Sequence, residues 1–263
     1  MSSFVRKVNQ STKAAPFDTC RVADLGDAWV RSPYNLVGSL GEISDFYTRL
    51  HQAGIVPVSC GGDHSVTLPI LRGIASRRPV GMVHFDAHCD TGDDYMGSRF
   101  HHGAPFRRAV EEGLLDPRRV IQIGIRGSLN DPDLWKFSHD SGMRVVYMDE
   151  FYEMGVERVV AEARRVVGDG PTYVSFDVDG LDPAYAPGTG TPEIGGFSTL
   201  EALMMIRGLR GLDLVGGDVV EVAPPFDQTG NTALVGATMM FEILCVVAES
   251  AKRRIRRLEA SHI

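Results

Sequence analysis

Aspartate and histidine residues gather in three short segments of this chain, residues 61–65, 86–90 and 177–182. The candidate ligands, four aspartates and two histidines, are His64, Asp86, His88, Asp90, Asp177 and Asp179. In an extended segment, residues i, i+2 and i+4 point the same way, so the side chains of one segment can converge. Carboxylate oxygen and imidazole nitrogen both bind divalent metal ions. The spacing therefore predicts a metal site.

The charge of this set indicates how many ions it holds. Taken singly, each Asp or His would more simply be a turn residue or a hydrogen-bonded structural group. Together, four carboxylates in a partly dry site would repel one another strongly. Two divalent cations would cancel that charge, and two of the carboxylates could bridge a metal pair ~3.5–4 Å apart. Because the set has no thiolate, it suits manganese or a similar ion better than a structural zinc.

Alternating strands and helices should position these segments. Apolar runs typical of strands buried on both faces occur at residues 54–59, 80–85, 120–125, 144–148, 172–176 and 212–222. Helical patterns lie between them, at residues 41–53, 65–76, 105–112, 156–167, 200–208 and 232–250. Ser198 and Glu201 form a capping-box pattern at the start of one of these helices. This order predicts an α/β fold, with a mostly parallel sheet between two helical layers. Such sheets bind ligands beyond the carboxyl ends of their strands.

Length and charge limit the class of protein. The 263 residues include 27 basic and 34 acidic side chains, a formal charge of −7, which argues against nucleic acid or an anionic membrane as a partner. We expect a single domain over residues 1–263. The most apolar segment, residues 232–248, contains Glu242 and falls short of the ~20 residues of a membrane span, so we interpret it as a core helix. The first seventeen residues lack the apolar region of a secretion signal, and the expected location is the cytoplasm.

The three segments resemble the metal-binding motifs of the ureohydrolase (arginase and agmatinase) superfamily. Residues 85–90, 175–183, 188–196 and 218–227 are most similar to its agmatinase-like branch, and the similarity covers roughly residues 8–249. The resemblance implies a three-layer α/β/α fold, two Mn²⁺ ions per chain, and assembly as a homo-oligomer, a trimer or hexamer. It also implies a reaction, the hydrolysis of a guanidino group to an amine and urea by a hydroxide that bridges the metals.

The resemblance further assigns a role to each candidate ligand. One metal would be bound by His64 and Asp90, and the other by His88 and Asp179. Both metals would be bridged by Asp86 and Asp177. His102, in a His-Gly segment, would shuttle a proton to the leaving amine, because imidazole titrates near neutrality. The alternative is an exposed loop histidine, and the adjacent His101 blurs the choice. Glu221 would bind the guanidinium through two hydrogen bonds. Its alternative is a buried glutamate paired with an arginine.

The N-terminal region departs from the family pattern. Relatives in this branch usually have a further N-terminal stretch that includes a strand, whereas only about sixty residues precede Gly61 here. Either the true start lies upstream, or the sheet lacks that strand, which would leave backbone hydrogen-bonding groups unpaired. This feature keeps a non-catalytic subunit open as an alternative function. A one-zinc deacylase of acetylated amines is a second alternative, disfavoured because six ligands are present instead of three.

The substrate is predicted from a single loop, residues 91–99. Asp93 and Asp94 favour a substrate with a distal ammonium, which makes agmatine, converted to putrescine and urea, the first choice. Arg99 could instead hold the carboxylate of 4-guanidinobutyrate or a related guanidino acid. Arginine is less favoured, since the loop lacks the arginase pattern of polar residues.

Overall fold

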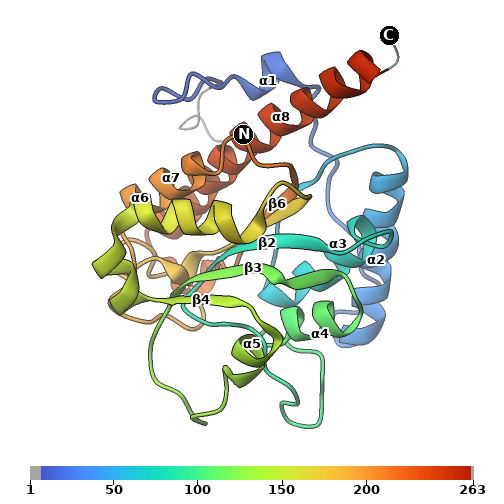
Figure 1. The fold of residues 1–263 in the computed structure, drawn as a ribbon. Helices are drawn as coiled ribbons and strands as arrows, with labels where there is room; N and C mark the ends of the chain where they lie inside the picture. Colours follow the sequence, from blue (N-terminus) through green and yellow to red (C-terminus); the bar gives the residue numbers. More distant parts are fainter. Residues whose placement is uncertain (1–6, 262–263) are drawn as a thin grey trace.

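The computed structural model describes residues 7–261 of the chain. Within them, six parallel strands form one sheet in the order β1-β6-β5-β2-β3-β4 (Figure 1). The strands are β1 (Val58–Cys60), β2 (Val80–Phe85), β3 (Leu115–Ile125), β4 (Arg144–Tyr147), β5 (Thr172–Asp177) and β6 (Leu214–Val220). The predicted fold class, a parallel sheet in a three-layer α/β/α arrangement, is confirmed.

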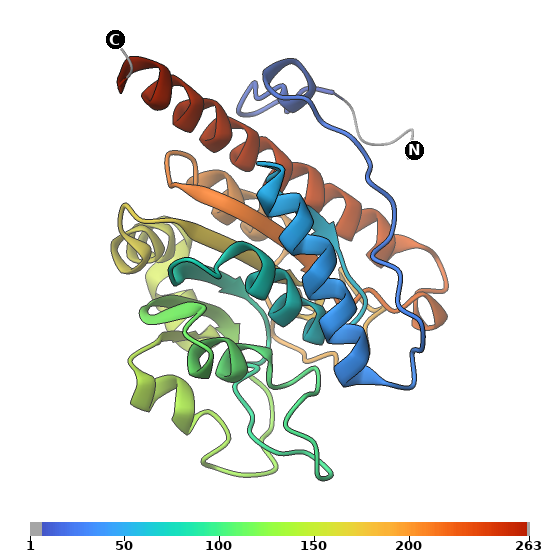
Figure 2. The same cartoon turned by 90° about the vertical axis from the view of Figure 1, so that its right-hand side faces the viewer.

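Helices cover both faces of the sheet. Those on one face are α6 (Met148–Val167), α7 (Thr199–Gly208) and α8 (Asn231–Ser261), which lie above the strands in Figure 1. Those on the other face are α2 (Leu36–Gln52), α3 (Thr67–Ile74) and α4 (Pro105–Glu111), with α2 and α3 in front of the strands in Figure 2. The shorter elements are α1 (Pro16–Thr19), α5 (Lys136–Ser141), η1 (His64–Val66), η2 (Val178–Gly180) and η3 (Pro224–Phe226).

Two hydrophobic clusters hold these layers together. Val83 and Phe85 of β2 belong to the cluster under α6, α7 and α8, whereas Met82 belongs to the cluster under α2, α3 and α4. The split follows from the alternation of side chains along a strand. Since both faces are covered, the strands read as continuous apolar runs, which explains why the sequence revealed them.

The helix boundaries follow local signals in the sequence. The predicted capping box is confirmed, since the Ser198 side chain accepts from Glu201 N and the Glu201 carboxylate accepts from Ser198 N. The predicted helix 232–250 is longer than expected and extends as α8 to Ser261. The basic run 252–257 is therefore part of a helix.

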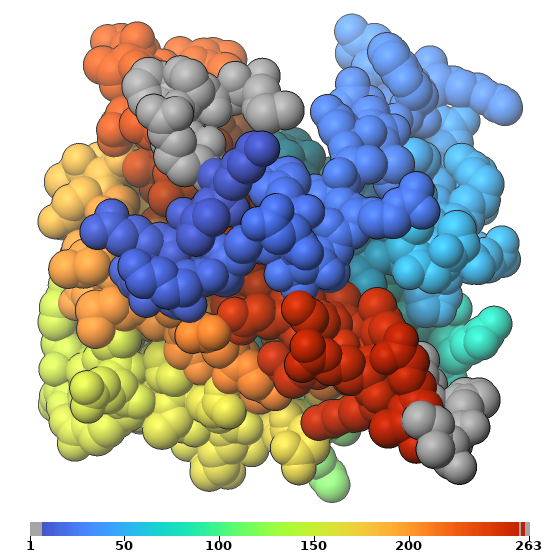
Figure 3. Space-filling model, turned by 90° about the horizontal axis from the view of Figure 1, so that it is seen from above, coloured from blue at the N-terminus to red at the C-terminus, as the bar shows by residue number. Residues whose placement is uncertain are grey.

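Helix α8 is long and apolar enough to cross a membrane by composition alone, with half of its most apolar window buried. Ile243 and Val246 on this helix pack in the core cluster. Its outer side is crossed by the N-terminal segment, blue over red in Figure 3, where Cys20 Sγ donates to Ala248 O at 3.5 Å. These contacts explain the apolar composition of α8, which packs as a core helix.

Strand β1 forms one edge of the sheet. Within residues 7–261 it pairs with β6 alone, and no strand precedes it in that range. Tyr47 of α2 supports this edge through a hydrogen bond to Ser59 Oγ at 2.8 Å. The short edge strand is thus tied to the helical layer by a side chain.

Candidate metal centre and active site

The three ligand-bearing segments lie directly after β1, β2 and β5. Because these strands are parallel, the segments meet at the carboxyl ends of the strands, which we call the metal edge. Each segment turns in the same way. Asp63, Asp86 and Asp177 each accept a hydrogen bond from the backbone N–H two residues further on, at 3.0, 2.6 and 2.8 Å. Asp side chains favour such turns because they bond their own backbone. The ligands therefore converge through turns, which corrects the expectation that an extended backbone would align them.

One half of the site surrounds His64, whose side chain is fully buried. His64 Nδ1 lies 3.1 Å from Asp86 Oδ2, 3.0 Å from Asp90 Oδ2 and 3.2 Å from Asp177 Oδ2. Although three oxygens surround this nitrogen, it has no hydrogen-bond partner. All four side chains thus point at one small volume.

The other half surrounds His88, whose side chain is 23% exposed. His88 Nδ1 lies 3.1 Å from Asp179 Oδ2 and 3.4 Å from Asp86 Oδ1. Asp86 therefore turns one oxygen to each half, as a bridging ligand would. Thr191 donates to Asp179 Oδ2 at 3.1 Å and orients that carboxylate. The structure thus brings all six predicted ligands together.

The chemistry of this donor set fits divalent cations. Burial and the neighbouring Asp179 and Asp86 raise the pKa of Asp177 well above its usual range. Burial and Asp86 raise the pKa of Asp179 to about 6. Burial opposes the charge on His88, but the carboxylates beside it still raise its pKa to about 12. Among themselves these groups must share protons, whereas two divalent ions would satisfy the buried carboxylates and the unpartnered imidazole nitrogen of His64.

Two site residues have a backbone conformation that is rare outside glycine. Asp90 and Glu221 have φ values of 53° and 64°. Such strain costs roughly 1–3 kcal/mol and persists where the surrounding structure fixes it. Glu221 is fixed at both ends, since its N–H donates to Gly62 O at 2.9 Å and its Oε1 accepts from His64 N at 2.7 Å. Burial raises the pKa of Glu221 to about 7. Glu221 thus adjoins the His64 half of the site, at the position predicted for it.

The predicted proton shuttle lies outside this cluster of contacts. His102 is exposed in the loop before α4, and among the described residues it makes no ion pair with the six ligands. Its neighbour His101 is less exposed, its Nε2 is buried without a partner, and burial lowers its pKa. The two rings are 6.2 Å apart. The role of His102 therefore remains a prediction.

The sequence reasoning missed His84. This fully buried residue on β2 donates through Nε2 to Asp86 Oδ2 at 2.7 Å, because its Nδ1 accepts from Gln122 Nε2 at 3.1 Å. The signal was available, since His84 precedes Asp86 by two residues and strand alternation puts both on one face. We interpret His84 as a support for the bridging carboxylate.

The sequence reasoning also missed Arg126, which follows β3. Its guanidinium donates to six main-chain carbonyls, those of Gly124, Asp179, Gly180, Leu181, Glu193 and Ile194. These bonds connect the turn that carries Asp179 to the loop 187–196 that carries Thr191. No local sequence pattern predicts these contacts, because five of the six carbonyls lie more than fifty residues away along the chain.

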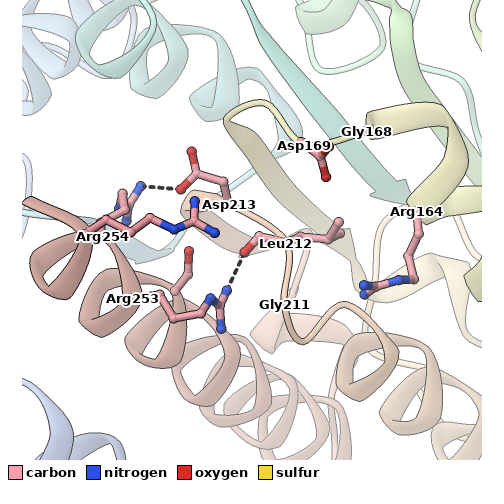
Figure 4. Close-up of a pocket in the computed structure, with 10 residues that line it drawn as sticks. Arg164, Gly168, Asp169, Gly211, Leu212, Asp213, Arg253 and Arg254 are labelled. Carbon is pink, nitrogen blue, oxygen red and sulfur yellow. Dashed lines mark hydrogen bonds and ion pairs between the residues drawn. The ribbon is translucent and has the colours of Figure 1, made fainter. Parts of the chain in front are cut away.

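A cavity of about 400 Å³ lies at the amino ends of the strands, beside the loops that precede β5 and β6 (Figure 4). Several arginines line it, but Arg253 donates to Leu212 O at 2.7 Å and Arg254 pairs with Asp213 at 3.3 Å. Arg164 donates to two further carbonyls. These guanidinium groups hold α8 and the preceding loops in place, and none of the predicted site residues lies there.

Comparisons with known proteins agree with this geometry. The profile described as "Arginase family" matches residues 1–246. A guanidinopropionase from Pseudomonas aeruginosa is 63% identical over 254 residues, which cover 96% of this chain and 80% of that relative. A mitochondrial agmatinase from Gallus gallus is 53% identical over 247 residues, which cover 94% of this chain and 72% of the relative. The solved structure of proclavaminate amidino hydrolase from Streptomyces clavuligerus matches with a TM-score of 0.89 and 38% identity, over 94% of this chain and 82% of that chain.

Proposed function

The chain belongs to the arginase family, as its motifs predicted, and we propose that it is a two-manganese hydrolase of a short guanidino acid. The observation that carries the two-metal part is the convergence of two histidines and four aspartates, with Asp86 turned toward both halves. When bound, the two metal ions would lower the pKa of water, which makes hydroxide available near neutral pH, and they would polarise the guanidino group.

Glu221 is suited to hold the guanidinium in this site. One of its oxygens accepts from His64 N, and a carboxylate has lone pairs left for a planar cation. Its raised pKa of about 7 leaves the group partly protonated in the free protein. A cationic substrate favours the ionised carboxylate, so binding and deprotonation of Glu221 reinforce each other. His102 would pass a proton to the departing amine from the exposed side.

Loop charge is a weak guide to the substrate, because Asp93 and Arg99 are already paired. Arg107 and Arg108 lie 3.0 and 2.9 Å from the Asp93 carboxylate. Arg99 pairs with Glu111 at 2.7 Å. Asp93 and Arg99 are therefore already paired with charges outside this choice, whereas the described contact of Asp94 is with Gly97 N at 2.9 Å. The preference for agmatine therefore loses the contribution of Asp93.

The similar proteins supply the substrate part of the proposal. The guanidinopropionase is 63% identical to this chain, which supports 3-guanidinopropionate as the first substrate to test. The agmatinase at 53% identity supports agmatine as the second candidate. Both compounds present the same guanidinium to the metal edge and differ at the distal end.

A urea-release screen tests this proposal. The Mn²⁺-loaded chain would be assayed with 3-guanidinopropionate, 4-guanidinobutyrate, agmatine and arginine. We expect the highest kcat/KM with 3-guanidinopropionate and loss of activity after chelation. A higher value with agmatine would establish the second candidate instead. Folded, metal-loaded protein that releases no urea from any of the four would overturn the hydrolase function.

Assembly and location complete the proposal. Trp29 and Tyr34 expose 84% and 97% of their surface, which supports contacts between copies in a homo-oligomer. A trimer or hexamer in sedimentation equilibrium is the expected outcome, and a monomer would contradict it. We place the enzyme in the cytoplasm, to be checked by fractionation of the source cell.

A further inference from the structure

The proposed function does not use the basic run 252–257 of α8. Three arginines of this run, Arg253, Arg254 and Arg257, line the cavity of about 400 Å³ at the amino ends of the strands. Arg164 of α6 extends toward the same cavity from its other side (Figure 4). Positive charge is thus concentrated at one place in a protein whose formal charge is −7.

Two of these arginines are held by neutral acceptors. Arg253 Nη2 donates to Leu212 O at 2.7 Å. Arg164 Nη1 donates to Gly208 O at 3.0 Å and to Arg210 O at 2.8 Å. Within residues 7–261 neither guanidinium forms an ion pair with a carboxylate. A carbonyl orients a guanidinium but does not cancel its charge, so both groups are fixed in place while their charges remain uncompensated.

Other arginines in this region are paired with acids. Arg210 binds Glu249 through two hydrogen bonds, at 2.9 and 2.7 Å. Arg254 pairs with Asp213 at 3.3 Å. The carboxylates nearby are therefore already used, and they leave the two carbonyl-bound arginines without a counter-ion.

The residues that line the cavity have an excess of positive charge. Arg257 makes no described hydrogen bond or ion pair, and Asp169 is the lining acid that has no described partner. Against this one carboxylate there are three guanidinium groups, those of Arg164, Arg253 and Arg257, which leaves two positive charges uncompensated. A phosphate monoester carries about −1.5 to −2 at pH 7, which matches that excess.

The unused donors of the two fixed arginines are available to such a group. Arg164 Nη2 has no described hydrogen bond and lies 3.5 Å from where a Cβ on Gly211 would be, so it faces a loop that lines the cavity. Arg253 likewise has Nε and Nη1 without described partners. The guanidinium fork matches two phosphate oxygens at once. We propose that this cavity binds a small free phosphate-bearing anion, held between α6, α8 and the loop before β6.

This anion site is separate from the metal edge. Strand β5 begins beside the cavity at Thr172 and ends at the metal edge at Asp177. At the rise of an extended strand, these ends are about 16 Å apart. A ligand in the cavity would therefore stabilise the packing of α8 without touching the substrate, and the inference does not depend on the proposed function.

Calorimetric titration of the full Mn²⁺-loaded chain with inorganic phosphate, at constant ionic strength, tests the site. We expect saturable binding that Arg253→Gln and Arg164→Gln each weaken at least about tenfold, because each removes charged hydrogen-bond donors. Phosphate bound to the metal ions would appear equally in every variant. Near-saturating phosphate should also raise the Tm of the unchanged chain by about 2–4 °C. Absence of binding, or equal affinity in the unchanged chain and both variants, would overturn the proposal.

Arg165→Gln is the matched control. Arg165 neighbours Arg164 on α6 but pairs with Glu162 at 2.7 Å, so its loss changes the net charge equally and should leave phosphate affinity within twofold. Weakening as large as that of Arg164→Gln would mean general attraction by charge, and the proposal would be wrong. Arg257→Gln should fold normally, since it breaks no described bond, and should also weaken phosphate binding. It decides the question if the other two variants fail to fold.

Vesicles distinguish a free anion from a lipid headgroup, which offers the same phosphate chemistry. The full chain would be sedimented with vesicles that contain phosphatidic acid. We expect the protein to stay in the supernatant, because the guanidinium groups line a cavity and the protein as a whole is acidic. Sedimentation that Arg253→Gln abolishes would assign the site to a lipid and overturn the free anion.

Discussion

The two halves of the metal edge are built differently. His64 is fully buried and is contacted at both ring nitrogens, by Ser175 at Nε2 and by carboxylates at Nδ1. His88 is 23% exposed, its described polar contacts are at Nδ1, and its ring lies 6.5 Å from that of Trp135. The buried half is preorganised, whereas the open half borders solvent. Since preorganised ligands lose less entropy on binding, we expect the His64 half to bind its ion more tightly.

The largest effect should come from the residue common to both halves. Asp86→Ala removes an oxygen from each, so we expect kcat/KM to fall by more than the about 100-fold typical of outer-shell changes. Metal analysis should show that neither ion is retained after gel filtration. Asp140→Ala, which changes an exposed carboxylate on α5, is the control and should keep both ions. Retention of one ion by Asp86→Ala would show that the halves are independent.

The next comparison separates the halves directly. At limiting Mn²⁺, the unchanged protein should fill the His64 half first. His64→Ala should abolish this tight binding, whereas His88→Ala should keep it and lose only the weaker event. Both variants should lose at least about 100-fold in activity, because the reaction needs the metal pair. Equal loss of tight binding in the two variants would contradict the asymmetry.

The pH profile sharpens the difference further through Glu221. Burial raises the pKa of Glu221 to about 7, so the carboxylate that we propose binds the guanidinium is protonated below that pH. We expect kcat/KM to fall as the pH is lowered and Glu221 becomes protonated, because a neutral carboxyl no longer pairs with the guanidinium. Glu221→Gln should lower kcat/KM and remove this acid limb. An unchanged limb in the Gln variant would assign the titration to another group.

The smallest effect should be confined to the open half. Thr191→Val removes the hydroxyl that donates to Asp179 Oδ2 while keeping the side-chain shape. We expect about tenfold weaker binding of the second ion and unchanged binding of the first. Calorimetry with Mn²⁺ measures both events. Weakening of the first ion instead would place Thr191 in the buried half.

The periodic parts of the fold were predictable from the sequence. The run 80–85 appears unchanged as β2, because a strand buried on both faces needs apolar residues at successive positions. The ligand segments were predictable because carboxylates and imidazoles right after buried strands have few structural reasons to cluster. The capping box before α7 was visible because its two partners are three residues apart.

Contacts between distant segments were decided by the tertiary structure. The sequence alone determined which residues are candidate ligands, since residue type and spacing after each strand set the local chemistry. It did not determine that Ser175 meets Asp218, that Arg126 holds two loops, or that the charges near Asp93 are already paired. Those outcomes depend on strand order and loop path, which arise from packing the whole chain and leave no periodic pattern in it.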